Sequence, residues 1–198
     1  MKHKKKVKQS FKLPQNVPVL VENFEEYDGL NRRILEDIEG MEYPNSYKTN
    51  VKAQMSTWAV RSPSLDDLKD IVDAYFVQAY KKHDGTPLYG DAAMVHSDVW
   101  VARYNEEDHT LSHNHWPSTW SWVYFVKCPP GSSPLVIHSA QPGDDGMEIE
   151  AKEGRLVIFP SICQHSVPSN KCKDRVVVAG NVVLCNKIVR DYILDRYA

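Results

Sequence analysis

The sequence predicts a mainly β fold of the α+β type, in which a β-sandwich or barrel carries a packed layer of helices. Three observations lead to this prediction. The hydrophobic pattern has a helical period in the first third of the chain, and it changes to a period of two after Gly90. Short β-type runs then follow one another at roughly regular spacing, and Gly-, Pro- and Asp-rich turns separate them. Helices gathered before such strands are typical of a sheet with a helical layer on it.

The N-terminal third is expected to hold one short strand and two helices. The run VPVLV at 17–21 predicts the strand. The first helix ends near Gly40, and the second begins at Ser64, where Ser64 and Asp67 have the spacing of a capping box. The apolar positions are Leu30, Ile34, Leu35 and Ile38 in the first helix, and Leu65, Leu68, Ile71, Val72, Tyr75, Phe76 and Ala79 in the second.

The remainder of the chain predicts six strands and a closing helix over 187–197. Each strand segment is short and rich in β-branched and aromatic residues. Strand order does not follow from this pattern. The predicted strands are 98–104, 119–126, 134–138, 147–151, 155–160 and 175–185.

Length and charge favour a single soluble, cytoplasmic domain over residues 13–198, preceded by a basic, flexible arm at 1–12. The arm holds six Lys and no carboxylate, so the remaining chain has 18 basic and 26 acidic residues and a net charge of −8. Such a body does not favour nucleic-acid binding. No apolar run is long enough for a membrane span, and no apolar stretch follows the basic start as in a secretory signal.

Four cysteines are too few and too scattered to form a disulfide framework in a chain of this length. Cys163 and Cys172 flank His165, but a zinc knuckle would need a fourth ligand at a regular spacing, and the sequence offers none. Reduced thiols in or beside strands are therefore expected.

Three of the eight histidines form a candidate metal site. His113 and His115 stand at i and i+2, and in an extended segment such side chains point to the same face. His165 follows the strand at 155–160. The alternative interpretation is a surface pair in a polar loop and a turn histidine with no metal.

The second half of the chain resembles the Fe(II)- and 2-oxoglutarate-dependent dioxygenases. It is similar to the prolyl-hydroxylase-like branch and to small phage and bacterial oxygenases of that superfamily. The resemblance covers residues 98–185 and rests on features in one order: Tyr104, His113-x-His115, WSWVYFV, EGRLVIFPSICQHSVP with His165, and Asp174-Arg175-Val176-Val177-Val178-Ala179-Gly180-Asn181.

This resemblance implies a double-stranded β-helix (a jelly roll, cupin-like) that binds Fe(II), 2-oxoglutarate and O₂ and hydroxylates a C–H bond. His113, His115 and His165 would hold the metal, with no catalytic residue beyond them. Arg175 would bind the far carboxylate of 2-oxoglutarate, because a guanidinium binds carboxylates bidentately and stays charged. Tyr104 would assist it. The prime substrate would be a peptide, such as peptidyl proline, or a small molecule.

Two residues depart from the resembled pattern. His115 stands where the family usually has a carboxylate, and Trp122 stands where small relatives usually have Gly. Trp120, Trp122 and Tyr124 share one strand face and are expected in the core, whereas Trp116, beside the histidine pair, is a candidate substrate wall.

Alternatives remain open at the level of function and of single residues. The chain could be a three-histidine cupin-type dioxygenase that does not use 2-oxoglutarate, or a non-catalytic β-barrel module. Tyr104 could be a core tyrosine, and Arg175 could be a surface partner of Asp174. Asp108 or His109 could reach the metal through a loop. The oligomeric state does not follow from the sequence.

Overall fold

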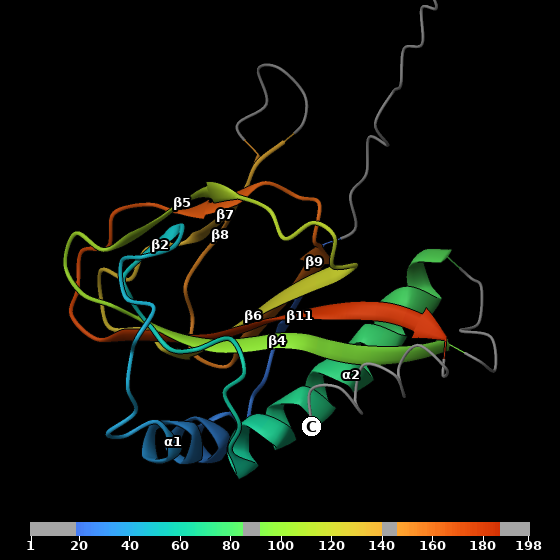
Figure 1. Cartoon of the computed structure of the whole chain (residues 1–198), viewed down its shortest axis with the longest axis horizontal. Helices are drawn as coiled ribbons and strands as arrows, with labels where there is room; N and C mark the ends of the chain where they lie inside the picture. The colour runs from blue at the N-terminus through green and yellow to red at the C-terminus, as the bar shows by residue number, and fades with distance from the viewer. Residues whose placement is uncertain (1–18, 85–91, 140–145, 187–198) are drawn as a thin grey trace, which may run out of the picture.

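The computed structural model describes residues 19–84, 92–139 and 146–186 (Figure 1). The predicted basic arm at 1–12 and the closing helix at 187–197 lie outside the described residues. The strand predicted at 17–21 corresponds to β1, which spans Leu20–Asn23 and so begins and ends later than predicted.

Two antiparallel sheets face each other and form the jelly roll that the resemblance implied (Figure 1). The larger sheet has the strand order β1-β9-β6-β11-β4-β3, and the smaller one has the order β2-β5-β10-β7-β8. The larger sheet consists of β1, β3 (Gln54–Met55), β4 (Ala92–Tyr104), β6 (Trp120–Lys127), β9 (Arg155–Pro160) and β11 (Arg175–Asn186). The smaller sheet consists of β2 (Val51–Lys52), β5 (His109–His113), β7 (Leu135–Ile137), β8 (Met147–Ile149) and β10 (His165–Val167).

All six predicted strands are present, and four short ones were not predicted from the pattern. Strands β2 and β3 have two residues each and β10 has three, so none is long enough to show an alternating pattern. Strand β5 contains the predicted extended segment only as far as His113.

Two helices form the predicted layer on the outer face of the larger sheet (Figure 1). Helix α1 spans Asp28–Asp37 and α2 spans Pro63–Asp84. Their apolar stripes are buried against the helix-facing side chains of β4, β6, β9 and β11, among them Trp122 and Tyr124 as predicted. The helices cover the outer face of this sheet, and burial of that face stabilises the fold. The site lies on the inner face, between the two sheets.

The start of α2 differs from the predicted capping box. Ser62, one residue before Pro63, is the N-cap: its hydroxyl oxygen accepts the Leu65 amide at 3.3 Å, and its carbonyl accepts the Asp66 amide. Ser64 instead donates both its amide and its hydroxyl to Asp37, which ties α2 to the end of α1. These two hydrogen bonds hold the pKa of Asp37 below its usual value.

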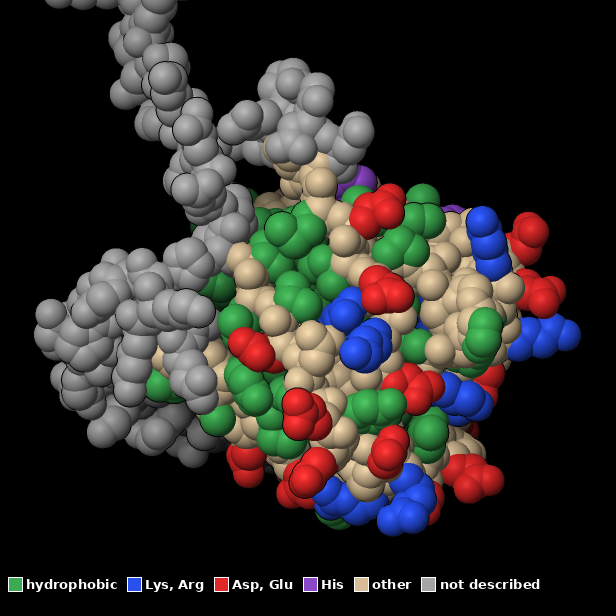
Figure 2. Space-filling model, turned by 180° about the vertical axis from the view of Figure 1, so that it is seen from behind, with side chains coloured by type: hydrophobic (Ala, Val, Ile, Leu, Met, Phe, Trp, Pro, Cys, Tyr) green, Lys and Arg blue, Asp and Glu red, His purple; other side chains and the backbone are tan. Residues whose placement is uncertain are grey.

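Basic and acidic side chains are interspersed on the face of the molecule in Figure 2. None of the helices in the described ranges is long and apolar enough to cross a membrane. All four cysteines are free thiols, and burial raises the pKa of Cys128 to about 12.

Trp122 fits the core only because residue 180 is glycine. The two residues are direct partners in the β6–β11 ladder. A Cβ at position 180 would lie 2.6 Å from Cζ2 of Trp122 and 2.7 Å from the Asp98 carbonyl oxygen. The bulky residue at 122 is thus accommodated by a small one on the neighbouring strand.

We therefore predict that Gly180→Ala lowers the free energy of unfolding by about 1–3 kcal/mol, the usual cost of overpacking a core. Chemical denaturation measures this change. Gly29→Ala is the matched control, because a Cβ there meets nothing within 4 Å. Equal stability of the two variants would contradict the prediction.

Candidate metal centre and anion pocket

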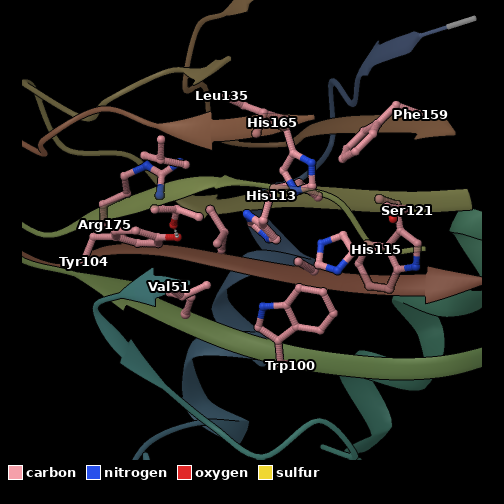
Figure 3. A pocket seen from close by; sticks show the side chains of 17 residues that line it. Val51, Trp100, Tyr104, His113, His115, Ser121, Leu135, Phe159, His165 and Arg175 are labelled. Atoms are coloured by element: carbon pink, nitrogen blue, oxygen red, sulfur yellow. Dashed lines mark hydrogen bonds between the residues drawn. The ribbon is translucent and has the colours of Figure 1, made fainter. Parts of the chain in front are cut away.

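The candidate site is a narrow cavity between the two sheets (Figure 3). Three histidines line one part of it, and Arg175 and Tyr104 line another. The remaining walls are mainly apolar, and Val51, Trp100, Leu135 and Phe159 are among the residues that form them. The predicted metal ligands and the predicted anion-binding residues therefore share one cavity.

His113 and His165 face each other across the β5–β10 ladder, with ring centroids 4.4 Å apart. The Nδ1 atom of each ring lies close to the carbonyl two residues earlier, at 2.8 Å from Leu111 O and 3.0 Å from Cys163 O. A carbonyl only accepts, so Nδ1 carries the proton in both rings. In a neutral imidazole this leaves Nε2 with a free lone pair, as a metal ligand requires.

A bulge in β5 turns His113 toward the cavity. His165 pairs with His113, but Val167, two residues later, pairs with Thr110, three residues earlier. The extra residue in β5 allows both Thr110 and His113 to line the cavity. A regular strand would have placed them on opposite faces.

His115 reaches the same cavity by a different route from the one predicted. It lies beyond the end of β5, so the two histidines do not share a strand face. Its amide donates to the Ser161 carbonyl at 2.8 Å, and the centroid of its ring lies 5.4 Å from that of Trp100, with the two rings tilted. Within the described part of the chain, no hydrogen bond holds the His115 ring.

The three rings are neutral at physiological pH. Burial, with a smaller contribution from the neighbouring His165 and His113, lowers the pKa of His115 to about 3. Burial likewise lowers the pKa of His165 to about 4 and shifts that of His113 downward. Neutral imidazoles are the form that binds transition metals.

The nitrogen donors of His113, His115 and His165 lie within 4.8 Å of one another. Three imidazole nitrogens from one cluster are a donor set that fits a divalent iron-type metal with open positions for other ligands. Asp108 and His109, the alternative ligands considered from the sequence, do not belong to this cluster. Asp108 accepts hydrogen bonds from the Tyr47 hydroxyl and the Asn105 amide, and the His109 ring bonds the Glu107 carbonyl.

Arg175 is a buried cation, so the alternative of a surface ion pair with Asp174 is wrong. Its side chain is only 1% exposed, and the rings of Tyr104 and Phe125 lie 4.5 and 5.3 Å from its guanidinium carbon. Asp174 pairs instead with Arg103 and Lys127.

Two guanidinium nitrogens of Arg175, Nε and Nη1, are buried without a hydrogen-bond partner among the described residues. An unpaired buried charge costs several kcal/mol. A carboxylate in this cavity would accept a hydrogen bond from an unpartnered N–H and supply the missing counter-charge. The arrangement therefore fits the far carboxylate of a dicarboxylate ligand.

Tyr104 lies beside Arg175 as its direct partner in the β4–β11 ladder (Figure 3). Its hydroxyl is 2.7 Å from the hydroxyl of Thr110, and only one of the two can donate in that bond. The other hydroxyl keeps a proton for a further acceptor. Whether Tyr104 contacts a ligand or only supports Arg175 stays a prediction, and Thr110 joins it as a residue that the sequence did not single out.

Trp116 does not line the cavity described above, and its side chain is 71% exposed. Its role as a substrate wall stays a prediction. Trp100 and Ser121, which do line the cavity, were not predicted. Their inward position depends on the register of the sheet, which the sequence did not reveal.

Comparisons with known proteins agree with this geometry. Residues 98–181, which contain the three histidines and Arg175, match the family model described as "Putative 2OG-Fe(II) oxygenase". The chain is therefore similar to the 2OG-Fe(II) oxygenases over these residues. No curated protein matches its sequence.

Solved structures similar to this chain include several prolyl hydroxylases. A prolyl-4-hydroxylase from Pseudomonas putida has a TM-score of 0.63 at 14% identity, over 84% of this chain and 93% of that one. A viral collagen prolyl hydroxylase from Paramecium Bursaria Chlorella virus-1, solved as a 2OG complex, has a TM-score of 0.61 at 13% identity, over 83% and 95%. The prolyl hydroxylase from Trichoplax adhaerens has a TM-score of 0.59 at 11% identity, over 83% of each chain.

The similarity to these structures extends beyond residues 98–185, for which the sequence suggested it. At such low identity it shows a shared fold. The match of residues 98–181 to this family, together with the histidine cluster, indicates an enzyme with Fe(II), 2-oxoglutarate and O₂ as its cofactors. The assignment of single residues to these cofactors is developed as a proposal below.

We predict that replacing His113 or His165 with Ala removes most bound Fe(II) and leaves the protein folded. Elemental analysis gives the iron content, and circular dichroism checks the fold. His109→Ala is the matched control, because its Nδ1 also bonds a carbonyl two residues earlier but its ring lies outside the cluster. If the His113→Ala or the His165→Ala variant retains its full iron content, the substituted residue is not a ligand.

We also predict that His115→Asp still binds Fe(II), because iron accepts carboxylate oxygen in place of an imidazole nitrogen. Titration with Fe(II) under anaerobic conditions measures the affinity. A folded variant that binds no metal would show that a carboxylate at 115 does not reach the ion, and that His115 has another role.

Proposed function

We propose that the protein is a 2-oxoglutarate-dependent Fe(II) oxygenase that hydroxylates an unactivated C–H bond of an amino-acid side chain, with peptidyl proline as the first candidate. The observation that carries the proposal is the buried Arg175 in the same cavity as the three histidines. The similar folds of three prolyl hydroxylases support the substrate class, and one of those was solved with a peptide fragment.

The proposed roles follow from the chemistry of each side chain. His113, His115 and His165 would hold the iron through neutral nitrogens. Arg175 would bind the far carboxylate of 2-oxoglutarate, and its two unpartnered nitrogens support this role. Tyr104 and Thr110 would orient that carboxylate with the remaining hydroxyl proton.

With these groups bound, the iron supplies oxidative decarboxylation of 2-oxoglutarate to succinate and CO₂, with transfer of the second oxygen atom of O₂ to the substrate carbon. The chain's own contribution is to place the two parts of the cosubstrate and to exclude water. The aromatic and aliphatic walls around the histidines support this role, because apolar walls exclude bulk solvent.

A cupin-type dioxygenase that does not use 2-oxoglutarate is the second candidate, and the three-histidine donor set is the observation in its favour. Such an enzyme would leave the Arg175 guanidinium without a counter-charge. For that reason we prefer the 2-oxoglutarate-dependent reaction.

The test is to measure succinate formation from 2-oxoglutarate by the Fe(II)-loaded protein, first alone and then with proline-containing peptides. Slow succinate formation without a peptide supports 2-oxoglutarate use. A peptide that both accelerates it and gains the mass of one oxygen atom supports the substrate class. Absence of 2-oxoglutarate binding would overturn the proposal in favour of the cupin-type candidate.

We predict that Arg175→Ala weakens 2-oxoglutarate binding at least tens-fold and leaves Fe(II) binding nearly unchanged. Loss of one partner of a buried charge pair typically costs about 2–5 kcal/mol. Arg175→Lys should give an intermediate affinity, because an ammonium lacks the planar two-donor geometry. Calorimetry measures all three affinities.

Arg103→Ala is the matched control for Arg175. Arg103 lies on β4 beside Tyr104, but its side chain pairs with Asp174 outside the cavity. Its removal should leave the 2-oxoglutarate affinity unchanged. If Arg175→Ala binds 2-oxoglutarate as well as the wild type, the carboxylate is anchored elsewhere.

A further inference from the structure

His115 is the histidine of the triad whose ring lacks the support that the other two have. His113 and His165 are each oriented by a carbonyl two residues earlier. The His115 ring has no such bond among the described residues, and it lies in a loop rather than in a strand. Its placement therefore depends on its main chain, and the amide of His115 is bound by the Ser161 carbonyl at 2.8 Å.

Ser161 is in turn fixed on several sides. It is fully buried, and its amide donates to the Thr119 carbonyl at 3.1 Å. Its hydroxyl begins a row of hydrogen-bonded polar side chains along the inner face of the larger sheet. The row continues from Ser161 to Ser121 at 2.8 Å, from Ser121 to Asn181 at 2.8 Å, and from Asn181 to Asp98 at 3.2 Å.

The strand register explains why these residues meet. Ser121 pairs directly with Asn181 in the β6–β11 ladder, and Asn181 pairs directly with Asp98 in the β11–β4 ladder. Direct partners on one face of a sheet have neighbouring side chains. The row therefore runs across three strands, and Ser121 and His115 both line the cavity (Figure 3).

The charge on Asp98 fixes the direction of every bond in the row. A carboxylate only accepts, so Asn181 presents its NH₂ group to Asp98 and its carbonyl oxygen to Ser121. Ser121 must then donate to Asn181, which leaves it to accept from Ser161. A row with one permitted orientation is more rigid than a set of hydroxyls free to rotate.

We propose that Ser161, Ser121, Asn181 and Asp98 form a positioning network that holds His115 in its metal-binding orientation. The proposal rests on the metal centre of the proposed function. The network replaces, through the Ser161 main chain, the direct carbonyl bond that orients the other two rings. None of its side chains needs to touch the metal or the substrate.

The test uses Co(II) as the metal, because its absorption bands report the geometry of the ligands as well as binding. Ser121→Ala removes the central hydroxyl of the row. We expect Co(II) affinity to fall about 10–100-fold, as is usual when an outer partner of a metal ligand is lost, and the absorption bands to shift.

Ser133→Ala is the matched control for a purely structural effect. Ser133 is also a buried serine whose hydroxyl bonds a carbonyl, that of Ser169, but it does not line the cavity. This variant should retain the Co(II) affinity and bands of the wild type. If Ser121→Ala matches Ser133→Ala in both measurements, the network has no positioning role and the proposal is overturned.

A pair of substitutions at Asp98 tests whether the row needs a hydrogen-bond acceptor for Asn181 at this position. Asp98→Asn keeps an oxygen that accepts from Asn181, so Co(II) affinity should stay close to that of the wild type. Asp98→Ala removes the acceptor and should weaken binding in the same sense as Ser121→Ala. Equal, wild-type affinity in both variants would overturn the role of Asp98.

The same measurements separate this inference from the proposed function. A wild-type protein that binds no Co(II) would overturn the metal centre and the network together. A wild-type protein that binds Co(II), together with a Ser121→Ala variant of unchanged affinity and bands, would overturn the network alone.

Discussion

The hydrogen-bond ladder that joins β11 to β4 on one side and β6 on the other is the interaction on which both the core and the site depend. Its register runs from Arg175 opposite Tyr104 to Asn186 opposite Ala92. Alternate residues of β11 face the helices and the cavity, so one strand carries both core valines and the polar groups of the site. A shift of this register by one residue would exchange the two faces and remove Arg175 from the cavity.

The electrostatics of the cavity favour a dianion. Three neutral imidazoles leave the charge of a divalent metal uncompensated, and Arg175 adds a buried positive charge with unpartnered donors. In enzymes with a carboxylate ligand, part of the metal charge is neutralised by the protein itself. Here 2-oxoglutarate would neutralise both cations at once, one with each end of the molecule. With His115 as a ligand in place of a carboxylate, the proposed site would therefore depend more on the charge of its cosubstrate.

The inner face of the larger sheet has two regions with different roles. Near Arg175 it presents a buried cation that lies over the rings of Tyr104 and Phe125, and we propose that this cation binds a carboxylate. Near His115 it presents a buried polar row that ends at Asp98, whose negative charge orients each hydrogen bond. The apolar side chains between these regions, such as Ala179 and Val177, keep water from competing for either set of groups.

The sequence by itself predicted the two described helices, six of the strands from β4 onward, and the histidines and the arginine that line the candidate site. Long amphipathic stripes and period-two runs are local patterns, and the order of His113, His115, His165 and Arg175 is characteristic of the family. The sequence did not reveal that Ser62 is the N-cap of α2. Ser64, the predicted cap, instead donates hydrogen bonds to Asp37, a residue of the other helix.

Only the tertiary structure decided how those residues meet. The bulge in β5 that turns His113 inward, the burial of Arg175 and the row from Ser161 to Asp98 all depend on cross-strand register. Ser121 and Asn181 are 60 residues apart in the chain, and Asn181 and Asp98 are 83 apart. Contacts over such separations arise from which strands pair and in which register, and the free energy that selects this pairing comes from burying both sheets together rather than from any local segment.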